Sequence, residues 1–218
     1  MTAKLMENRL NEIHKKISMN ETTRKNYKEI WAEMIRFLEG SWSGFKINAI
    51  VKSGSIVRQT ENKNSDLDIL IGISENNFNT KAILAELEQL AWSWFDEDDG
   101  NSPHLPKIHV GPNALHLGFD YLGIDVDLVP ATLKKIPKEK VHNELIYDLP
   151  KIKKRAVRLV KWAFNSFKSD IHNYEIALNV LHINENGLVE LVTSLINYFR
   201  GRIEKAGSSV DQVLTKLQ

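Results

Sequence analysis

Apolar residues recur at three- and four-residue steps in several stretches of the chain, and this spacing predicts amphipathic helices. The clearest stretch is 21–40, where Asn20 or Thr22 is placed to cap the first turn and Gly40 suits the C-terminal end. The same spacing predicts further helices over residues 6–17, 79–95, 151–168, 173–182, 186–203 and 208–217.

Runs that are β-branched or alternate between apolar and polar residues predict strands in the first half of the chain. These runs are residues 45–54, 66–73, 107–111, 114–119 and 122–131. After Pro137 the pattern changes to helices, the first of them predicted from residue 151. This order predicts an α+β core with an N-terminal helix over residues 1–135 and a C-terminal helical subdomain over residues 136–218.

The composition narrows the class of protein. The 218 residues include no cysteine, which excludes disulfides and thiolate metal sites and fits a reducing compartment. No apolar run reaches the length of about 18 residues that a membrane span needs. The first twenty residues are too charged for a secretory signal. We therefore expect a soluble, cytoplasmic protein without a membrane partner.

Charge is unevenly spread, although the net charge is only +1. Residues 61–100 carry ten acidic and two basic residues, whereas residues 134–168 carry eleven basic and three acidic ones. The bases at 151, 154, 155 and 158 lie opposite the apolar stripe of their predicted helix. This pattern fits either a solvated face or a track for nucleic-acid phosphates.

Two strands carry carboxylates at alternate positions, Asp66 with Asp68 and Asp125 with Asp127. Alternate residues of a strand point to the same face, so each pair is expected to lie side by side. Like charges repel and are costly to bury unless something pairs them. A surface-facing pair is one explanation, and convergence on Mg²⁺, which prefers carboxylate oxygens, is the other.

Three histidines occur near the predicted strands, His104, His109 and His116. A zinc site would need a spaced His pair or cysteines beside them, and the chain has neither. We interpret all three as surface histidines or as core histidines with satisfied hydrogen bonds.

Gly54 and Ser55 follow the first predicted strand. A glycine there allows the backbone to approach a ligand closely, and the serine offers a hydroxyl and an N–H to phosphate oxygens. A Gly-Ser pair alone is usually just a turn. Here eleven further residues lead to the Asp-x-Asp of Asp66 and Asp68, and a later strand supplies another acid.

This arrangement resembles the nucleotidyltransferase superfamily that includes DNA polymerase β, the CCA-adding enzymes, the oligoadenylate synthases and the bacterial cyclic-oligonucleotide synthases. The matching segments are "SGSIVRQTENKNSDLDIL" and "IDVDLVPA". The resemblance implies a mixed-sheet core and a Mg²⁺ or Mn²⁺ site. The implied metal ligands and catalytic residues are Asp66, Asp68 and Asp127, and the implied nucleotide-binding residues are Gly54, Ser55 and Thr60. The family usually has glycine where this chain has Gln59, so the resemblance does not imply the family's loop geometry here.

The helical half resembles the oligoadenylate-synthase and cyclase branch. "VRLVKWAF" is similar to the helix whose lysine holds the donor triphosphate, and this implies that role for Lys161. "IHNYEIALNVL" is similar to the segment whose tyrosine stacks on the donor base, which would be Tyr174. Without the resemblance, Lys161 would be read as a solvated lysine at the edge of the apolar stripe and Tyr174 as a core residue.

The activity that the resemblance implies is transfer of a nucleoside monophosphate from an NTP, with ATP as the expected donor, to a hydroxyl acceptor. The acceptor is expected to be a nucleotide or an RNA 3′ end, and pyrophosphate is the second product. Two alternatives remain at this point. One is an idle module of the same fold that binds nucleic acid or a partner protein, and the other is a transferase that modifies a protein or a small molecule.

Overall fold

The computed structural model describes residues 2–40, 44–96, 106–165, 167 and 171–217. The chain divides into two compact units. The sheet unit comprises residues 19–57 and 64–143, and the helical unit comprises residues 1–18, 58–63 and 144–218. The short segment 58–63, which belongs to the predicted Gly-Ser to Asp-x-Asp loop, is thus part of the helical unit. The predicted acidic loop after residue 96 and His104 lie outside the described residues.

The sheet unit is built on five strands: β1 (Ile47–Lys52), β2 (Leu67–Ile73), β3 (Lys107–Val110), β4 (Leu115–Phe119) and β5 (Ile124–Thr132). Their order in the sheet is β1-β2-β5-β4-β3, and β2 and β5 are parallel while the other neighbours are antiparallel. All five strands were predicted, so the α+β class is confirmed.

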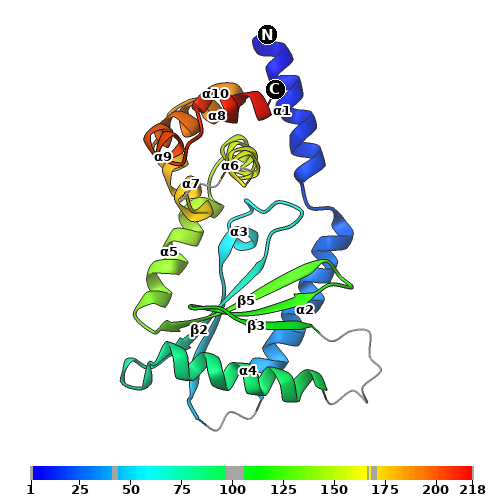
Figure 1. Cartoon of the computed structure of the whole chain (residues 1–218), viewed down its shortest axis with the longest axis vertical. Coiled ribbons are helices and arrows are strands. Elements are labelled where there is room, and N and C mark those ends of the chain that lie inside the picture. The colour runs from blue at the N-terminus through cyan, green and yellow to red at the C-terminus, as the bar shows by residue number, and fades with distance from the viewer. Residues whose placement is uncertain (1, 41–43, 97–105, 166, 168–170, 218) are drawn as a thin grey trace. The chain divides into compact units, whose positions relative to one another are not determined.

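One face of the sheet is apolar, as the alternation along the strands predicts. Residues 67, 69, 71 and 73 of β2 are all buried, together with residues 124, 126 and 128 of β5. Helices α2 (Glu21–Glu39) and α4 (Thr80–Asp96) share a hydrophobic core with this face (Figure 1). Their predicted caps form, because the side chains of Asn20 and Asn79 accept hydrogen bonds from Thr23 N–H at 2.8 Å and Ala82 N–H at 3.1 Å.

The sequence pattern missed one long helix, α5 (Lys135–Tyr147). Its apolar residues do not form one buried stripe, since Val141, Leu145 and Tyr147 are exposed while Ile136 and Ile146 are buried. Pro137 falls in its first turn, where a missing N–H costs nothing, and there it does not break the helix. The spacing of apolar residues therefore did not predict this helix. The remaining short elements of the sheet unit are α3 (Gly54–Val57) and η1 (Glu75–Asn77).

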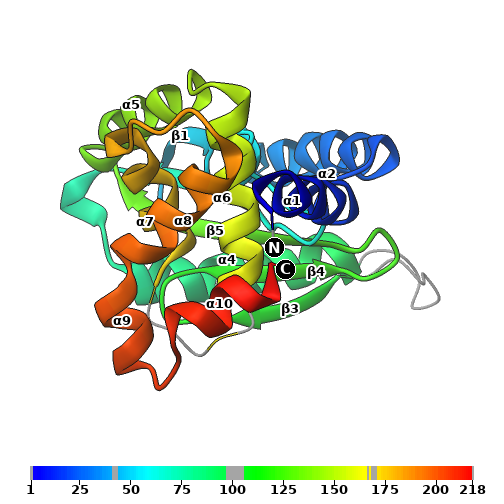
Figure 2. The ribbon, with the colours of Figure 1, turned by 90° about the horizontal axis from the view of Figure 1, so that it is seen from above.

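The helical unit contains α1 (Ala3–Ile17), α6 (Lys151–Phe164), α7 (Asn173–Asn179), η2 (Val180–His182), α8 (Leu188–Tyr198), α9 (Arg200–Lys205) and α10 (Val210–Lys216). Helix α6 contacts α1, α7, α8 and α10 (Figure 2). Most of its apolar stripe is buried in a core shared with these helices, and Ile152 is partly buried. The single helix expected over residues 186–203 is divided at Phe199 into α8 and α9.

The expected domain boundary differs from the division in the structure at the N-terminus. We expected residues 1–135 to form one domain, but α1 belongs to the helical unit. Its buried residues Leu10, Ile13 and Ile17 lie in the same hydrophobic core as α6 and α8. An amphipathic pattern shows that a helix has a buried face, but it does not show which partner covers that face.

Among the helices within the described ranges, none combines the length and the apolar character required to cross a membrane.

Candidate functional site

The Gly-Ser turn of the sheet unit lies directly against the Asp68 carboxylate. Gly54 has a φ of +72°, and a Cβ at this position would overlap the Asp68 side chain. The Ser53 N–H donates to the Asp68 carbonyl oxygen at 2.9 Å, which continues the pairing of β1 with β2. The Ser53 hydroxyl also donates to the Glu139 carboxylate of α5. The glycine is therefore required both by the left-handed backbone and by the close approach of the carboxylate.

Asp68 and Asp127 are register partners on the parallel strands β2 and β5. Register partners point to the same face of a sheet, so the two predicted ligands lie side by side on the face opposite the apolar core. Asp66 lies one residue before β2 begins, and Asp125 is the exposed neighbour two residues before Asp127 on the same face. The structure thus brings Asp68 and Asp127 together, and both are only partly exposed.

Asp127 has a partner that the sequence analysis did not assign. Its Oδ1 lies 2.6 Å from Nδ1 of His116 on β4. Within the parts of the chain that the structure describes, no group of three or more His, Cys, Asp or Glu side chains is arranged to hold a metal ion. The donor set of two adjacent carboxylates still fits a hard divalent cation, because oxygen is the ligand such cations prefer. The assignment of Asp66, Asp68 and Asp127 as metal ligands stays a prediction.

Gln59, where the family usually has glycine, adopts a left-handed conformation. Its φ is +55°, and it is the only residue other than glycine with a positive φ in the described ranges. Two bases of α6 hold it there. Lys154 Nζ donates to the Gln59 side chain at 3.0 Å, and Arg158 Nη2 donates to its carbonyl oxygen at 2.8 Å. These contacts offset the cost of a non-glycine residue in this region, which is about 1 kcal/mol or more.

Thr60 and Lys161, both predicted to bind the nucleotide, contact each other in the helical unit. Lys161 Nζ donates to the Thr60 carbonyl oxygen at 3.1 Å. Both residues are buried, with 1% of Thr60 and 4% of Lys161 exposed, and the Thr60 hydroxyl oxygen is buried without a hydrogen-bond partner among the described residues. The alternative for Lys161, a solvated lysine at the edge of the apolar stripe, does not hold, because the side chain is buried and contacts segment 58–63. Their roles in binding stay predictions.

Tyr174, predicted to stack on the donor base, lies in the first turn of α7 and is half-buried. The guanidinium of Arg58 lies 4.7 Å from the centre of its ring, within the range of a cation–π contact. Arg58 is buried and was not singled out from the sequence. The contact shows that the Tyr174 ring can take a flat, planar group against its face. Its role with a donor base stays a prediction.

Several bases on the basic face of α6 contact other residues of the helical unit. Lys154 is buried, and Arg155 donates to Asn11 of α1. Arg158 contacts Gln59, Glu61 and His14. Three of the four bases thus have partners within the helical unit, in α1 or segment 58–63, and the nucleic-acid track stays a prediction. Lys151 alone among the four bases at 151, 154, 155 and 158 is exposed.

Arg155 and Arg158 contribute to a shift in the pKa of His14, a histidine that the sequence analysis did not single out. His14 of α1 is half-buried, and Arg158 Nη1 lies 3.2 Å from its Nε2. Burial, followed by the charges of Arg158 and Arg155, lowers the pKa of His14 from 6.5 to about 4. At neutral pH the imidazole is therefore uncharged and accepts the hydrogen bond from Arg158.

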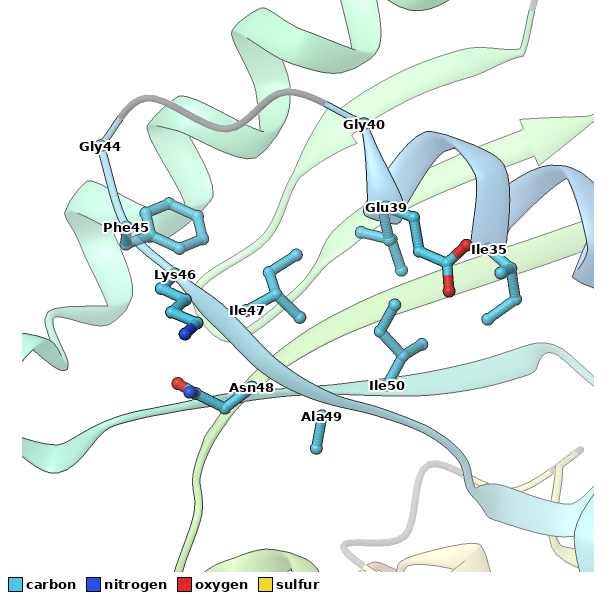
Figure 3. A pocket seen from close by; sticks show the side chains of 11 residues that line it. Ile35, Glu39, Gly40, Gly44, Phe45, Lys46, Ile47, Asn48, Ala49 and Ile50 are labelled. Carbon is cyan, nitrogen blue, oxygen red and sulfur yellow. The ribbon is translucent and has the colours of Figure 1, made fainter.

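A surface pocket of about 860 Å³ lies elsewhere on the sheet unit, between the end of α2 and β1 (Figure 3). Figure 3 shows the side chains of Ile47 and Ile50 on the α2 side of β1 and those of Lys46 and Asn48 on the other side. The wall is formed by Ile35, Leu38, Glu39, Gly40, Gly44, Phe45, Lys46, Ile47, Asn48, Ala49 and Ile50. None of the predicted site residues is among them, so this pocket is separate from the carboxylates.

Comparisons with known proteins identify the fold. No family model matches the chain, and no curated protein matches it. Among solved structures, the Bradyrhizobium diazoefficiens CD-NTase CdnG in complex with GTP has a TM-score of 0.70 at 14% identity, covering 94% of this chain and 80% of that one. CdnC of E. coli MS115-1, in its complex with HORMA-deltaN, has a TM-score of 0.67 at 17% identity, with coverages of 89% and 70%.

A polymerase gives a similar match. The Cid1 poly(U) polymerase with Mg 3′-dATP has a TM-score of 0.66 at 13% identity, covering 91% of this chain and 74% of that one. At such identities the likeness shows the fold alone. The CD-NTases and the poly(U) polymerase have the same fold as this chain. The chain therefore has the fold of the polymerase β-like nucleotidyltransferases.

Proposed function

We propose that this chain is a metal-dependent nucleotidyltransferase, which transfers a nucleoside monophosphate from an NTP to a hydroxyl acceptor and releases pyrophosphate. The observation that carries the proposal is the pairing of Asp68 with Asp127 in register on β2 and β5, with Gly54 pressed against the Asp68 carboxylate. Two carboxylates side by side repel each other, and binding one nucleotide through a shared cation would compensate for that repulsion.

Asp66, Asp68 and Asp127 are the proposed ligands of one or two Mg²⁺ or Mn²⁺ ions. Such ions, when bound, supply charge neutralisation on the phosphates and on the attacking oxygen. The chain's own part is to hold the carboxylates in place without further rearrangement. The backbone pairing of β2 with β5 does this for Asp68 and Asp127, because both side chains start from hydrogen-bonded strands.

Each unit carries residues that are proposed to bind the donor nucleotide. Gly54, whose missing side chain leaves space for the Asp68 carboxylate, is proposed to bring its backbone near a phosphate, and Ser55 is proposed to offer its hydroxyl and N–H to phosphate oxygens. On the helical unit, Lys161 is the proposed donor to the β- and γ-phosphates, and Tyr174 is the proposed base-stacking residue. Thr60 is proposed to support this loop, since its carbonyl oxygen already contacts Lys161.

In the proposed step the acceptor hydroxyl oxygen forms a bond to the α-phosphorus of the NTP. The bond between the α-phosphorus and the oxygen that bridges to the β-phosphorus breaks, and pyrophosphate leaves with that oxygen. The hydroxyl proton passes to solvent. The protein forms no covalent bond with the substrates. Positioning and charge neutralisation therefore account for the rate acceleration.

We propose ATP as the donor and a nucleotide or an RNA 3′ end as the acceptor. The neighbours support NTP use in general, since their structures are described with GTP, ATP and 3′-dATP. The basic face of α6 lends no support to RNA, because its arginines contact residues of the same unit.

The test is incubation of the protein with labelled ATP, GTP, CTP or UTP and Mg²⁺ or Mn²⁺, with and without RNA. We expect pyrophosphate and a labelled product for at least one NTP, and loss of both in Asp68→Asn. Asp125→Asn is the matched control, because Asp125 is an exposed carboxylate on the same sheet face and is not a proposed ligand. If NTPs bind but no pyrophosphate forms with any acceptor, the chain is a binding module.

A further inference from the structure

A row of polar side chains crosses the sheet at the level of the carboxylates. His109 of β3 pairs with His116 of β4, His116 pairs with Asp127 of β5, and Asp127 pairs with Asp68 of β2. Register partners on adjacent strands lie on the same face and within contact distance. Two histidines that the sequence analysis read as ordinary surface or core residues therefore continue the row of proposed metal ligands.

The contact between His116 and Asp127 is short and directional. The Nδ1 to Oδ1 distance of 2.6 Å is slightly shorter than the range of about 2.7–2.9 Å that is usual for a charge-assisted hydrogen bond. An ionised carboxylate only accepts hydrogen bonds, so Nδ1 must carry the proton. The hydrogen bond holds one oxygen of the Asp127 carboxylate in place. It therefore restricts rotation of the carboxylate about the Cβ–Cγ bond.

The β3–β4 hairpin holds the His116 ring in this position. The ring of His109 stacks on it, with 5.8 Å between the centres and 19° between the planes. On the other side of the turn, a Cβ at Gly111 would lie 2.6 Å from Nε2 of His116, so only glycine leaves space for the ring. The Gly111 N–H donates to the Ala114 carbonyl oxygen at 2.9 Å and closes the turn.

We propose that His116 is a positioning residue that orients the Asp127 carboxylate for metal binding, with His109 and Gly111 fixing the His116 ring. This inference rests on the proposed function. A carboxylate beside a second carboxylate tends to rotate away from it, because the two charges repel. The His116 N–H holds Asp127 in one orientation before a cation arrives. Groups that orient metal ligands in this way typically change metal affinity or activity by about 10- to 100-fold when removed.

The experiment compares His116→Leu, which removes the donor, with His116→Asn, whose amide N–H lies near the position of Nδ1. Mn²⁺ binding is measured from the electron paramagnetic resonance of the free ion, which does not depend on turnover. We expect His116→Leu to bind Mn²⁺ about 10- to 100-fold more weakly than the wild type. We expect His116→Asn to recover most of that affinity. His182→Leu, an exposed histidine of the helical unit, is the matched control.

Kinetics and folding give the second readout. We expect kcat at fixed Mn²⁺ to fall in His116→Leu with little change in KM for the NTP, because His116 acts through Asp127. Circular dichroism and the unfolding midpoint should remain close to the wild type. If His116→Leu binds Mn²⁺ like the wild type, or if His116→Asn is impaired as much as His116→Leu, the inference is overturned. If the wild type itself binds no Mn²⁺ and transfers no nucleotide, the proposed function fails instead.

Discussion

The carboxylates of the sheet unit and the bases of the helical unit are held in different ways. Asp68 and Asp127 take their positions from the backbone pairing of β2 with β5. Lys154 and Lys161 take theirs from side-chain hydrogen bonds to the segment 58–63, and they are 8% and 4% exposed. The backbone thus fixes the acidic residues independently of any ligand, whereas the bases are held by contacts that a ligand can replace.

This difference has a consequence for nucleotide binding. A phosphate that approaches Lys161 competes with the Thr60 carbonyl oxygen for the same ammonium group. A cation that approaches Asp68 meets a carboxylate already placed beside the Gly54 turn. We therefore expect substitutions among the acids to affect chemistry and leave folding intact, and substitutions among the bases to affect both binding and stability.

The largest effect is expected for Asp68→Asn. If Asp68 is the metal ligand that we propose, its loss removes several kcal/mol of charge stabilisation, so we expect transfer to fall by about 1,000-fold. The amide is nearly isosteric and fits against Gly54, so the circular dichroism spectrum and the unfolding midpoint should remain close to the wild type. Rates of pyrophosphate release measure the effect. Comparable activity in Asp68→Asn and Asp125→Asn would show that the carboxylates on this face have no special role.

Lys161→Ala should lower both nucleotide affinity and stability. We expect the free energy of unfolding to fall by about 1–3 kcal/mol, because the buried Thr60 carbonyl oxygen loses a charged donor. NTP binding, measured by calorimetry at a temperature where the variant is folded, should weaken by about tenfold or more, as expected for a lost charge-assisted hydrogen bond. Lys151→Ala on the same helix is the exposed control. If affinity is unchanged while stability falls, Lys161 has only a structural role.

A smaller effect concerns His14, whose pKa is lowered to about 4 by burial and by Arg158 and Arg155. As the pH falls below about 6.5, the unfolded chain takes up a proton at His14 and the folded chain does not, so stability decreases. Between neutral pH and about pH 5 we expect the wild type to lose roughly 1 kcal/mol more than His14→Gln, allowing for solvent screening of a half-exposed ring. Denaturant unfolding at both pH values measures this difference.

The same contact has a spectroscopic test. In Arg158→Gln the pKa of His14 should rise toward 6.5, because one of the two nearby positive charges is gone. NMR titration of the imidazole follows this directly. An unchanged His14 pKa in this variant would show that Arg158 does not contribute and that burial and Arg155 account for the shift.

The smallest effect is expected for Gln59→Gly. Glycine relieves the left-handed backbone but loses the side-chain contact with Lys154, so we expect the free energy of unfolding to change by less than about 1 kcal/mol. In a Lys154→Met background the contact is already absent, and there Gln59→Gly should stabilise the protein by about 1 kcal/mol. A double-mutant cycle with denaturant unfolding measures both values. Identical effects of Gln59→Gly in the two backgrounds would argue against coupling between these residues.

The sequence by itself determined the strands and most helices of this chain, because each has a regular apolar pattern or a clear cap. It also determined that Asp125 and Asp127 share a face of β5, since alternation along a strand is a local property. The Gly54 turn was predictable for the same reason, as a glycine directly after a strand. Helix α5 was missed because its exposed Val141 and Leu145 blur the periodic signal.

The tertiary structure decided which of these elements meet. Asp68 and Asp127 become neighbours only because β5 inserts between β2 and β4, an order that no local pattern contains. Lys161 is buried and Gln59 is held in a left-handed conformation because segment 58–63 packs on α6. The His116 contact with Asp127 likewise depends on strand register. Contacts between residues far apart in the chain arise from packing and pairing, and periodicity along the chain does not record them.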